Sequence, residues 1–249
     1  MGKSGNRLME FKQFSVRDDQ CAMKVGTDAL LLGAWSDIQG ADFILDVGSG
    51  SGIIALMLAQ RAAKAKVVLV ELEGGAFMQN SANINCSPFK SRMESFQKSV
   101  QEFSLEERWA GAFDVVVSNP PFFHDKPKSP DEARNLARHD DFLSLSDLLE
   151  SALRCLKPNG RIMLVWPMDR RLELFKEANS RGLFLKHELV VHGSPEHEAT
   201  RFLSEWHPSP QQFGSSTRLN IENGVRAGKS VELSPDYAVL LRPYLKKLV

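Results

Sequence analysis

The sequence has little cysteine, no long hydrophobic run and no excess of charge of either sign. Its three cysteines, Cys21, Cys86 and Cys155, are spaced too widely for a disulfide framework or a zinc site, so we expect buried thiols in a reducing compartment. The longest uninterrupted apolar run, Ile53–Ala59, is far shorter than a membrane span, and the first residues lack the apolar core of a signal peptide. We therefore expect a soluble, cytoplasmic protein with no membrane partner.

The charge balance excludes some classes of protein. The 31 basic and 31 acidic side chains cancel, which argues against a polybasic protein that coats nucleic acid. Local basic excess nevertheless falls in three windows, residues 1–24, 126–138 and 241–249, and these allow selective contacts with RNA. With 43% hydrophobic and 25% charged residues, the composition is that of a folded globular chain, which excludes disorder, collagen and coiled coil.

Strand-like and helix-like segments alternate along the chain. Apolar, strand-like runs occur at Phe43–Val47, Val67–Val70, Phe113–Val117 and Arg161–Trp166. Helices are expected between and after them, at Ile53–Lys64, Ala76–Asn85, Leu143–Leu156 and Asp169–Ser180. Strands without polar alternation are buried on both faces, so the pattern predicts an α/β fold with a mostly parallel sheet and helices on both faces.

The character of the chain changes near its C-terminus. Leu183–His192 and Arg201–His207 read as two longer strands joined by a turn, which predicts a hairpin and an antiparallel edge to the sheet. No stretch rich in Pro, Gly and Ser separates these strands from the rest, so residues 1–249 are expected to form a single domain.

A glycine-rich turn follows the first of the apolar strands. Gly48, Gly50 and Gly52 let the backbone turn tightly and approach a ligand closely. Asp46, two residues before Gly48, would repel a pyrophosphate but suits a cationic ligand, and Glu71 ends the next strand, where an acidic residue accepts hydrogen bonds from ribose hydroxyls. These features indicate S-adenosylmethionine, which carries a sulfonium and an ammonium, and they disfavour NAD and NTP.

The segment Asn119-Pro120-Pro121-Phe122 is the sharpest signal in the chain. A strand that meets two prolines has to end there, and ligands bind beyond the carboxyl ends of parallel strands. The side-chain oxygen of Asn119 and the carbonyl of Pro120 can both accept hydrogen bonds from an exocyclic amine, while Phe122 offers a face on which a base stacks. The pattern predicts methyl transfer to an amino nitrogen, with these four residues as the catalytic set.

The chain also resembles a known family. Its motifs are those of class I S-adenosylmethionine-dependent methyltransferases with an Asn-Pro-Pro-aromatic motif, and more closely those of the tRNA1(Val) adenine-N6 methyltransferases. The segments that carry the resemblance are Phe11–Phe14, Cys21–Trp35, Leu45–Gly52, Ala82–Pro88 and Ser118–Phe123. The stretch Met23–Trp35 is the most specific of them.

This resemblance implies a Rossmann-like sheet of seven strands and methylation of the adenosine 3′ to the anticodon. It implies an N-terminal cap, residues 1–35, that contacts the cofactor. The cofactor contacts expected from the motif and the resemblance together are Lys24, Gly26, Thr27, Asp46, Gly48, Gly50, Gly52, Glu71, Ser99 and Asn119. Ser99 stands where the family usually has an acidic residue that contacts the cofactor adenine, and Phe122 replaces the commoner Tyr.

A charged stretch follows the catalytic motif directly. Residues 126–141 are a candidate substrate lid, with a plain solvated loop as the alternative. Within it, the candidate RNA contacts are Lys126, Lys128, Arg134, Arg138 and His139. His187, His192 and His197 recur every five residues, which is not a metal-ligand spacing, so no metal is expected.

The sequence therefore predicts S-adenosylmethionine-dependent N6-methylation of an adenosine in a tRNA anticodon loop, with the target base flipped out of its stack. The sequence does not set the oligomeric state, and a monomer is assumed. Three alternatives remain open. The first is another amino nitrogen as target: guanine in rRNA, adenine in DNA or a protein glutamine. The second is a nicotinamide-dependent oxidoreductase on the same scaffold, and the third is a binding module without catalysis.

Overall fold

The structure is a computed structural model that describes residues 7–121, 143–210, 212–227 and 230–247. The strands are β1 (Leu8–Glu10), β2 (Ser15–Arg17), β3 (Phe43–Val47), β4 (Lys66–Glu71), β5 (Met93–Gln97), β6 (Phe113–Ser118), β7 (Leu156–Pro167), β8 (Phe184–His192), β9 (Ala199–His207), β10 (Ser215–Asn220), β11 (Glu222–Ala227) and β12 (Ser230–Leu233). The helices are α1 (Thr27–Trp35), α2 (Ile53–Arg61), α3 (Gly74–Asn85), α4 (Val100–Ser104), α6 (Leu145–Cys155), α7 (Arg171–Ser180) and α8 (Pro235–Leu241). Short 3-10 turns lie at Lys90–Arg92, Glu107–Trp109 and Met168–Arg170.

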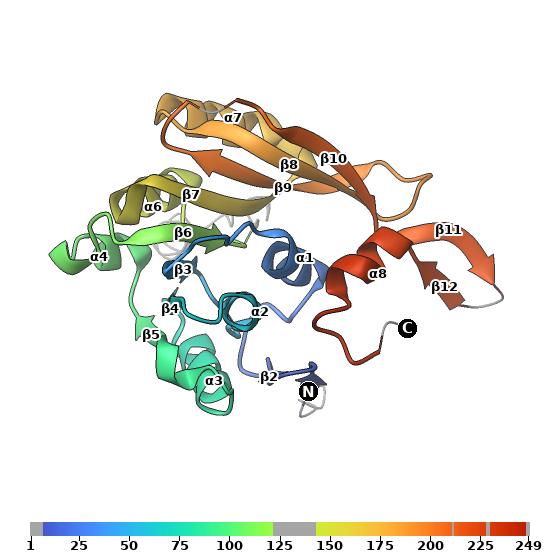
Figure 1. Cartoon of the computed structure of the whole chain (residues 1–249), viewed down its shortest axis with the longest axis horizontal. Coiled ribbons are helices and arrows are strands. Elements are labelled where there is room, and N and C mark those ends of the chain that lie inside the picture. The colour runs from blue at the N-terminus through green and yellow to red at the C-terminus, as the bar shows by residue number, and fades with distance from the viewer. Residues whose placement is uncertain (1–6, 122–142, 211, 228–229, 248–249) are drawn as a thin grey trace, which may run out of the picture.

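One large sheet organises the chain, in the strand order β10-β8-β9-β7-β6-β3-β4-β5 (Figure 1). Strands β3 to β7 pair in parallel, and β9 runs antiparallel to both β7 and β8. The predicted α/β fold with an antiparallel C-terminal hairpin is confirmed. Because β3 and β6 are neighbours while β4 lies on the other side of β3, the glycine turn after β3 and the Asn119 motif after β6 meet at one edge.

The sheet has eight strands rather than the seven expected. The additional strand, β10, pairs in parallel with β8 and forms the edge of the sheet. Its sequence is polar, and Leu219 is its one aliphatic residue, so it lacks the apolar run by which strands are recognised. Backbone pairing to β8 and the burial of Leu219 alone hold it in the sheet.

Two hydrophobic clusters cover the two faces of the sheet. One joins Ile44, Val117 and Val165 to α1 and α2, and the other joins Leu45, Val116 and Leu164 to α4, α6 and α7. Figure 1 shows these two groups of helices on opposite sides of the strands. Residues alternate between the two faces along each strand. Asp46 is two residues after Ile44 and Asn119 is two residues after Val117, so both lie on the face that α1 and α2 cover.

Local sequence explains where the elements begin and end. Helix α6 begins after Ser144, whose hydroxyl accepts a hydrogen bond of 3.0 Å from the amide of Asp147, as the capping pattern predicted. The chain then enters β7 at once, five residues earlier than the predicted strand at Arg161. The N-terminal β1–β2 hairpin is tied to the C-terminal segment by a bridge between Phe11 and Leu245.

Candidate active site

The glycine turn lies at the carboxyl edge of the sheet, between β3 and α2. Gly48, Gly50 and Gly52 all have positive φ, at 66°, 52° and 78°, which any other residue adopts only with strain. A Cβ at Gly48 or Gly50 would meet no atom within 4 Å, so both border open space, whereas one at Gly52 would touch Asn80 at 3.2 Å and Leu69 at 3.3 Å. Gly48 and Gly50 can thus face a ligand, and Gly52 is required by packing.

Helix α3 holds this turn in place through two asparagines. The side-chain amide of Asn80 donates to Ser49 Oγ at 3.1 Å and to the carbonyl of Gly50 at 3.3 Å. Asn83 donates to the carbonyls of Ser51 and Arg17, both at 2.8 Å. Asn83 falls within the family motif Ala82–Pro88, whereas Asn80 lies outside every motif, and nothing local in the sequence indicates the distant partners of either residue.

Asp46 is the most perturbed carboxyl at this edge. It is fully buried, and its Oδ2 accepts a hydrogen bond of 3.1 Å from the amide of Ala55 in α2, while its Oδ1 has no partner in the part of the chain that the structure describes. Burial raises the pKa of Asp46 to about 7, and the nearby negative charge of Glu71 adds to the increase. Because the described residues provide this buried carboxylate with only one hydrogen bond and no positive charge, the site favours a cationic ligand.

Glu71 connects the end of β4 to both neighbouring turns. Its Oε2 accepts a hydrogen bond of 2.7 Å from the amide of Gly50, and its Oε1 accepts one of 2.9 Å from the amide of Glu73. Each oxygen keeps a further lone pair that a ligand hydroxyl can use. The carboxylate is thus held at the mouth of the glycine turn, where the sequence predicted a ribose contact.

Residues 17–26 form a strap that reaches from α3 to the first turn of α1. Within it the ammonium of Lys24 donates to the carbonyls of Asp18, Asp19 and Cys21 at 2.7, 3.1 and 3.0 Å. The buried carboxylate of Asp18 accepts the amide of Val25 at 2.8 Å. Lys24 was predicted as a cofactor contact. Its three N–H donors instead bind carbonyls within the strap and stabilise the conformation of the strap.

The strap ends at Gly26 and Thr27, where α1 begins. The side chain of Thr27 hydrogen-bonds to Tyr237 of α8, and the carboxylate of Asp28 pairs with Arg201 of β9. The first turn of α1 is thereby fixed by two elements distant in sequence. Both predicted contacts in this turn, Gly26 and Thr27, lie next to these anchors.

Asn119 follows the last residue of β6 on the face covered by α1 and α2. Ser118 ties this strand end to β3, since its hydroxyl donates to the carbonyl of Val47 at 2.9 Å. The Oδ1 atom of Asn119 is buried and has no hydrogen-bond partner among the described residues. Pro120 is buried and Pro121 half-buried directly after it. The motif thus offers an acceptor that the protein does not use.

The unpartnered buried atoms at this edge share one property. Of the nine buried side-chain nitrogen and oxygen atoms without a partner among the described residues, five belong to the strap, α1, β3 or the Asn119 motif, and all five are acceptor oxygens, on Asp18, Asp19, Asp28, Asp46 and Asn119. Leaving such atoms unpaired costs about 1–3 kcal/mol each, so they mark a place where a ligand supplies donors. A cationic ligand rich in N–H groups fits this set.

Ser99 is engaged in a local role. It is the N-cap of α4: its hydroxyl accepts the amide of Glu102 at 3.2 Å and donates to the carboxylate of Glu102 at 2.9 Å. This capping box occupies the hydroxyl at the position where the family usually has an acidic residue. The hydroxyl of Ser99 is therefore already bonded to Glu102 at the position where an acidic residue would meet an adenine amine.

Several predicted residues lie outside the described residues. They are Phe122, the whole of the candidate lid 126–141, and the candidate RNA contacts Lys126, Lys128, Arg134, Arg138 and His139. Within the described ranges, no group of three His, Cys, Asp or Glu side chains is arranged to hold a metal ion, and no helix has the length and apolarity needed to cross a membrane.

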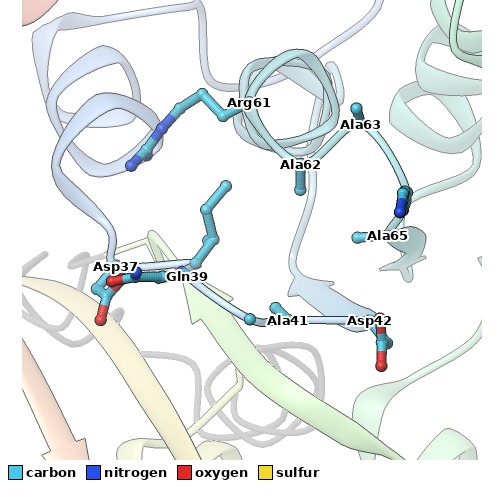
Figure 2. Close-up of a pocket in the computed structure, with 11 residues that line it drawn as sticks. Asp37, Gln39, Ala41, Asp42, Arg61, Ala62, Ala63 and Ala65 are labelled. Atoms are coloured by element: carbon cyan, nitrogen blue, oxygen red, sulfur yellow. The ribbon is translucent and has the colours of Figure 1, made fainter.

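A cavity of about 690 Å³ lies at the opposite edge of the sheet, lined by residues 37–42 and 61–65. Figure 2 shows Arg61 extending from α2 toward α1, with Asp37 and Asp42 on the loop that leads into β3. Because this cavity lies at the amino ends of β3 and β4, it is separated from the glycine turn by the length of the strands.

Comparison with known proteins agrees with this site. The family model described as methyltransferase small domain matches residues 22–180, which include the strap from residue 22 onward, the glycine turn and the Asn119 motif. Among solved structures, a predicted O-methyltransferase from Agrobacterium tumefaciens superposes with a TM-score of 0.67 at 19% identity, covering 87% of this chain and 96% of that one. The fold and site define a class I methyltransferase.

Relatives narrow the class further. A protein of Parabacteroides distasonis named tRNA1(Val) (adenine(37)-N6)-methyltransferase is 42% identical over 87% of this chain and 90% of its own length. One of the same name from Trichodesmium erythraeum is 37% identical over 98% of this chain and 99% of its own length. The chain belongs to this family of tRNA1(Val) (adenine(37)-N6)-methyltransferases.

The cofactor follows from this membership. The chain is an enzyme that uses S-adenosylmethionine, as the glycine turn with Asp46 predicted. The Pyrococcus horikoshii protein TYW2, solved in complex with MeSAdo, shares the fold with a TM-score of 0.58 at 13% identity, covering 84% of this chain and 74% of that one. The oxidoreductase and the binding-module alternatives are thereby set aside.

Proposed function

We propose that this enzyme transfers a methyl group from S-adenosylmethionine to N6 of an adenosine in tRNA, the adenosine at position 37 of tRNA1(Val) that its relatives are named for. The observation that carries the proposal is the buried Oδ1 of Asn119, an acceptor without a partner at the carboxyl end of β6. An exocyclic amine has the N–H donors that this atom lacks.

The residues divide into two groups along the edge of the sheet. Gly48, Gly50, Asp46 and Glu71 form the half of the site after β3 and β4, and this half holds the cofactor, whose sulfonium supplies an electrophilic methyl group. Asp46 and Glu71 favour its positive charges and its ribose hydroxyls. Gly26, at the end of the strap, and Thr27, the first residue of α1, contact it from the other side.

Asn119 and Pro120 form the other half, after β6. The Oδ1 of Asn119 and the carbonyl of Pro120 accept the two N–H groups of the amine, which orients the nitrogen lone pair for attack. A neutral amine needs orientation rather than a strong base, which agrees with a motif that contains no His or Cys. Phe122 supplies the stacking face for the flipped base.

The tRNA substrate adds further expectations. The anticodon loop is single-stranded, so its base leaves the stack at less cost than one in a duplex. We assign the phosphate contacts to Lys126, Lys128, Arg134, Arg138 and His139, and we expect the enzyme to act as a monomer in the cytoplasm.

Nucleoside mass spectrometry tests the substrate. The protein is incubated with labelled S-adenosylmethionine and, separately, with unmodified tRNA, rRNA, DNA and cell protein. The proposal predicts labelled N6-methyladenosine in tRNA, at one adenosine next to the anticodon. Label confined to rRNA, DNA or protein overturns the tRNA assignment while leaving the methyltransferase class intact.

A further inference from the structure

An ion pair joins the first turn of α1 to the start of β9. Arg201 Nη1 pairs with Asp28 Oδ2, although the two residues are 173 positions apart in the sequence. The side chain of Asp28 is 16% exposed and that of Arg201 36%. The other oxygen of the carboxylate, Oδ1, is buried without a partner. Asp28 is therefore held in one orientation by Arg201 and keeps an unused acceptor.

Sheet register places this pair on the far side of Asn119 from the glycine turn. Ser118 of β6 lies opposite Leu164 of β7, and Pro167 of β7 lies opposite Arg201 of β9. Arg201 is thus two strands away from Asn119 and two residues further toward the carboxyl ends of the parallel strands. At ordinary strand spacing, the Cα atoms of the two residues are about 12 Å apart. By alternation from Leu203, Arg201 lies on the same face as Asn119, the face that α1 covers.

The carboxylates at this edge divide between the two halves of the site. Among the described residues, those with a buried unpartnered oxygen are Asp18, Asp19, Asp28 and Asp46. Asp18 and Asp19 belong to the strap, and Asp46 lies on β3 beneath the glycine turn. Asp28 is the one that an ion pair fixes to β9, on the side of Asn119 that faces away from the glycine turn.

Methyl transfer to an amine moves positive charge from the cofactor sulfur to the substrate nitrogen, toward the half of the site at β6, β7 and β9. As the N–C bond forms and the S–C bond breaks, sulfur becomes neutral and the nitrogen becomes cationic, and it then releases one proton to solvent. A fixed negative charge on the nitrogen side stabilises that change more than it stabilises the ground state.

We propose that Asp28 supplies this charge: it stabilises the cationic amine of the substrate, and Arg201 is a positioning residue that holds the carboxylate toward it. This inference rests on the proposed function only in requiring an amine as methyl acceptor. The Asn119 and Pro120 acceptors serve the two amine hydrogens, so Asp28 acts through its charge.

The test compares Asp28→Asn with Asp37→Asn. Asp37 is also paired with an arginine, Arg161 at 3.6 Å, but at the opposite edge of the sheet. We expect Asp28→Asn to lower kcat by about 10- to 100-fold with KM for tRNA changed less than about 3-fold. The ratio of the Kd values for S-adenosylmethionine and S-adenosylhomocysteine, measured by calorimetry, should stay unchanged, because the proposal assigns the charge of Asp28 to the substrate amine and not to the sulfonium. Asp37→Asn should behave as the wild type in each assay.

A second variant removes the risk that an unpaired Arg201 disturbs folding. The double variant Asp28→Asn with Arg201→Gln leaves no unmatched charge, and it should lose no more activity than Asp28→Asn alone, since Arg201 acts through Asp28. Arg201→Lys should recover most of the activity that Arg201→Gln loses.

Three results overturn the inference. The first is a wild-type kcat in an Asp28→Asn protein that still binds S-adenosylhomocysteine. The second is a change, in Asp28→Asn, of the ratio of the Kd values for S-adenosylmethionine and S-adenosylhomocysteine, and the third is loss of S-adenosylhomocysteine binding by both Asp28→Asn and the double variant. Failure of the proposed function shows differently, as a wild-type enzyme that leaves tRNA unlabelled. The same comparison is then made on whichever amine the wild type methylates.

Discussion

The amide of Gly50 donates a hydrogen bond of 2.7 Å to Oε2 of Glu71, so the glycine turn after β3 and the end of β4 are one connected unit. The second oxygen of the same carboxylate receives the amide of Glu73, which leads into α3. A single side chain thus sets the distance between the two loops that we propose hold the cofactor.

Replacing Glu71 by Gln should weaken cofactor binding by at least about 10-fold, because a glutamine has one acceptor oxygen where the carboxylate has two and carries no negative charge. Calorimetry with S-adenosylhomocysteine measures the change. Glu173→Gln is the matched control, since Glu173 pairs with Arg170 on the surface at 2.7 Å and lies far from the turn in sequence. An unchanged Kd in Glu71→Gln contradicts the assigned role.

Alanine substitutions at Gly48 and Gly40 distinguish the effect of backbone strain from the effect of lost ligand contact. Gly48 and Gly40 have similar φ values, 66° and 72°, and a Cβ on either meets no atom within 4 Å. Alanine at either position should therefore cost about 1–2 kcal/mol of folding stability, measured by urea denaturation. Gly48→Ala alone should lose cofactor affinity, because its Cβ enters the space beside the turn. Equal affinities in the two variants would mean that Gly48 does not face the ligand.

Asp46 should make stability and binding depend on pH. Burial, with help from Glu71, raises the pKa of Asp46 to about 7 in the folded chain, whereas in the unfolded chain it is near 4. Between these values the folded state binds more protons, so stability falls as pH rises from about 4 to 7 and then levels off. Asp46→Asn should flatten this part of the curve of melting temperature against pH.

The same group predicts proton release on binding. A cationic ligand favours the ionised carboxylate, so S-adenosylmethionine should displace a proton from Asp46 below pH of about 7, and its affinity should fall as the solution becomes more acidic. Calorimetry at pH 6 in buffers of different ionisation enthalpy detects the proton. No difference between buffers for the wild type would show that Asp46 is already ionised in the free enzyme.

Ser99 should matter for stability more than for the cofactor. Ser99→Ala removes the capping box of α4 and should cost about 1 kcal/mol of unfolding free energy. Ser144→Ala, which removes the corresponding cap of α6, should cost a similar amount. Because the hydroxyl of Ser99 is committed to Glu102, Kd for S-adenosylhomocysteine should change less than about 3-fold. A large loss of affinity at unchanged stability would instead assign Ser99 to the cofactor.

The central half of the fold could be predicted because its signals are local. The bounds of β3 are those predicted, and the hairpin of β8 and β9, the cap at Ser144 and the turn at Gly48 each depend on neighbours in the sequence. The polar strand β10 gave no such signal. The prediction of a single domain over residues 1–249, and the site assignments as a whole, stay predictions.

The parts of the site that could not be predicted are the contacts between distant residues. Asn80 and Asn83 reach the glycine turn from α3, and Arg201 reaches Asp28 across the sheet. The residue type of Lys24 does not reveal whether its ammonium binds a ligand or three backbone carbonyls. Its partners depend on how the strap folds over the edge.

The most direct test of the account is the Asn119→Ala variant assayed on unmodified tRNA. The account predicts that wild-type protein forms N6-methyladenosine in tRNA, and that Asn119→Ala forms none above background while binding S-adenosylhomocysteine with a Kd within about 3-fold of the wild-type value. N6-methyladenosine formation by the variant at the wild-type rate would contradict the account, because the unpartnered oxygen of Asn119 would then have no part in orienting the amine.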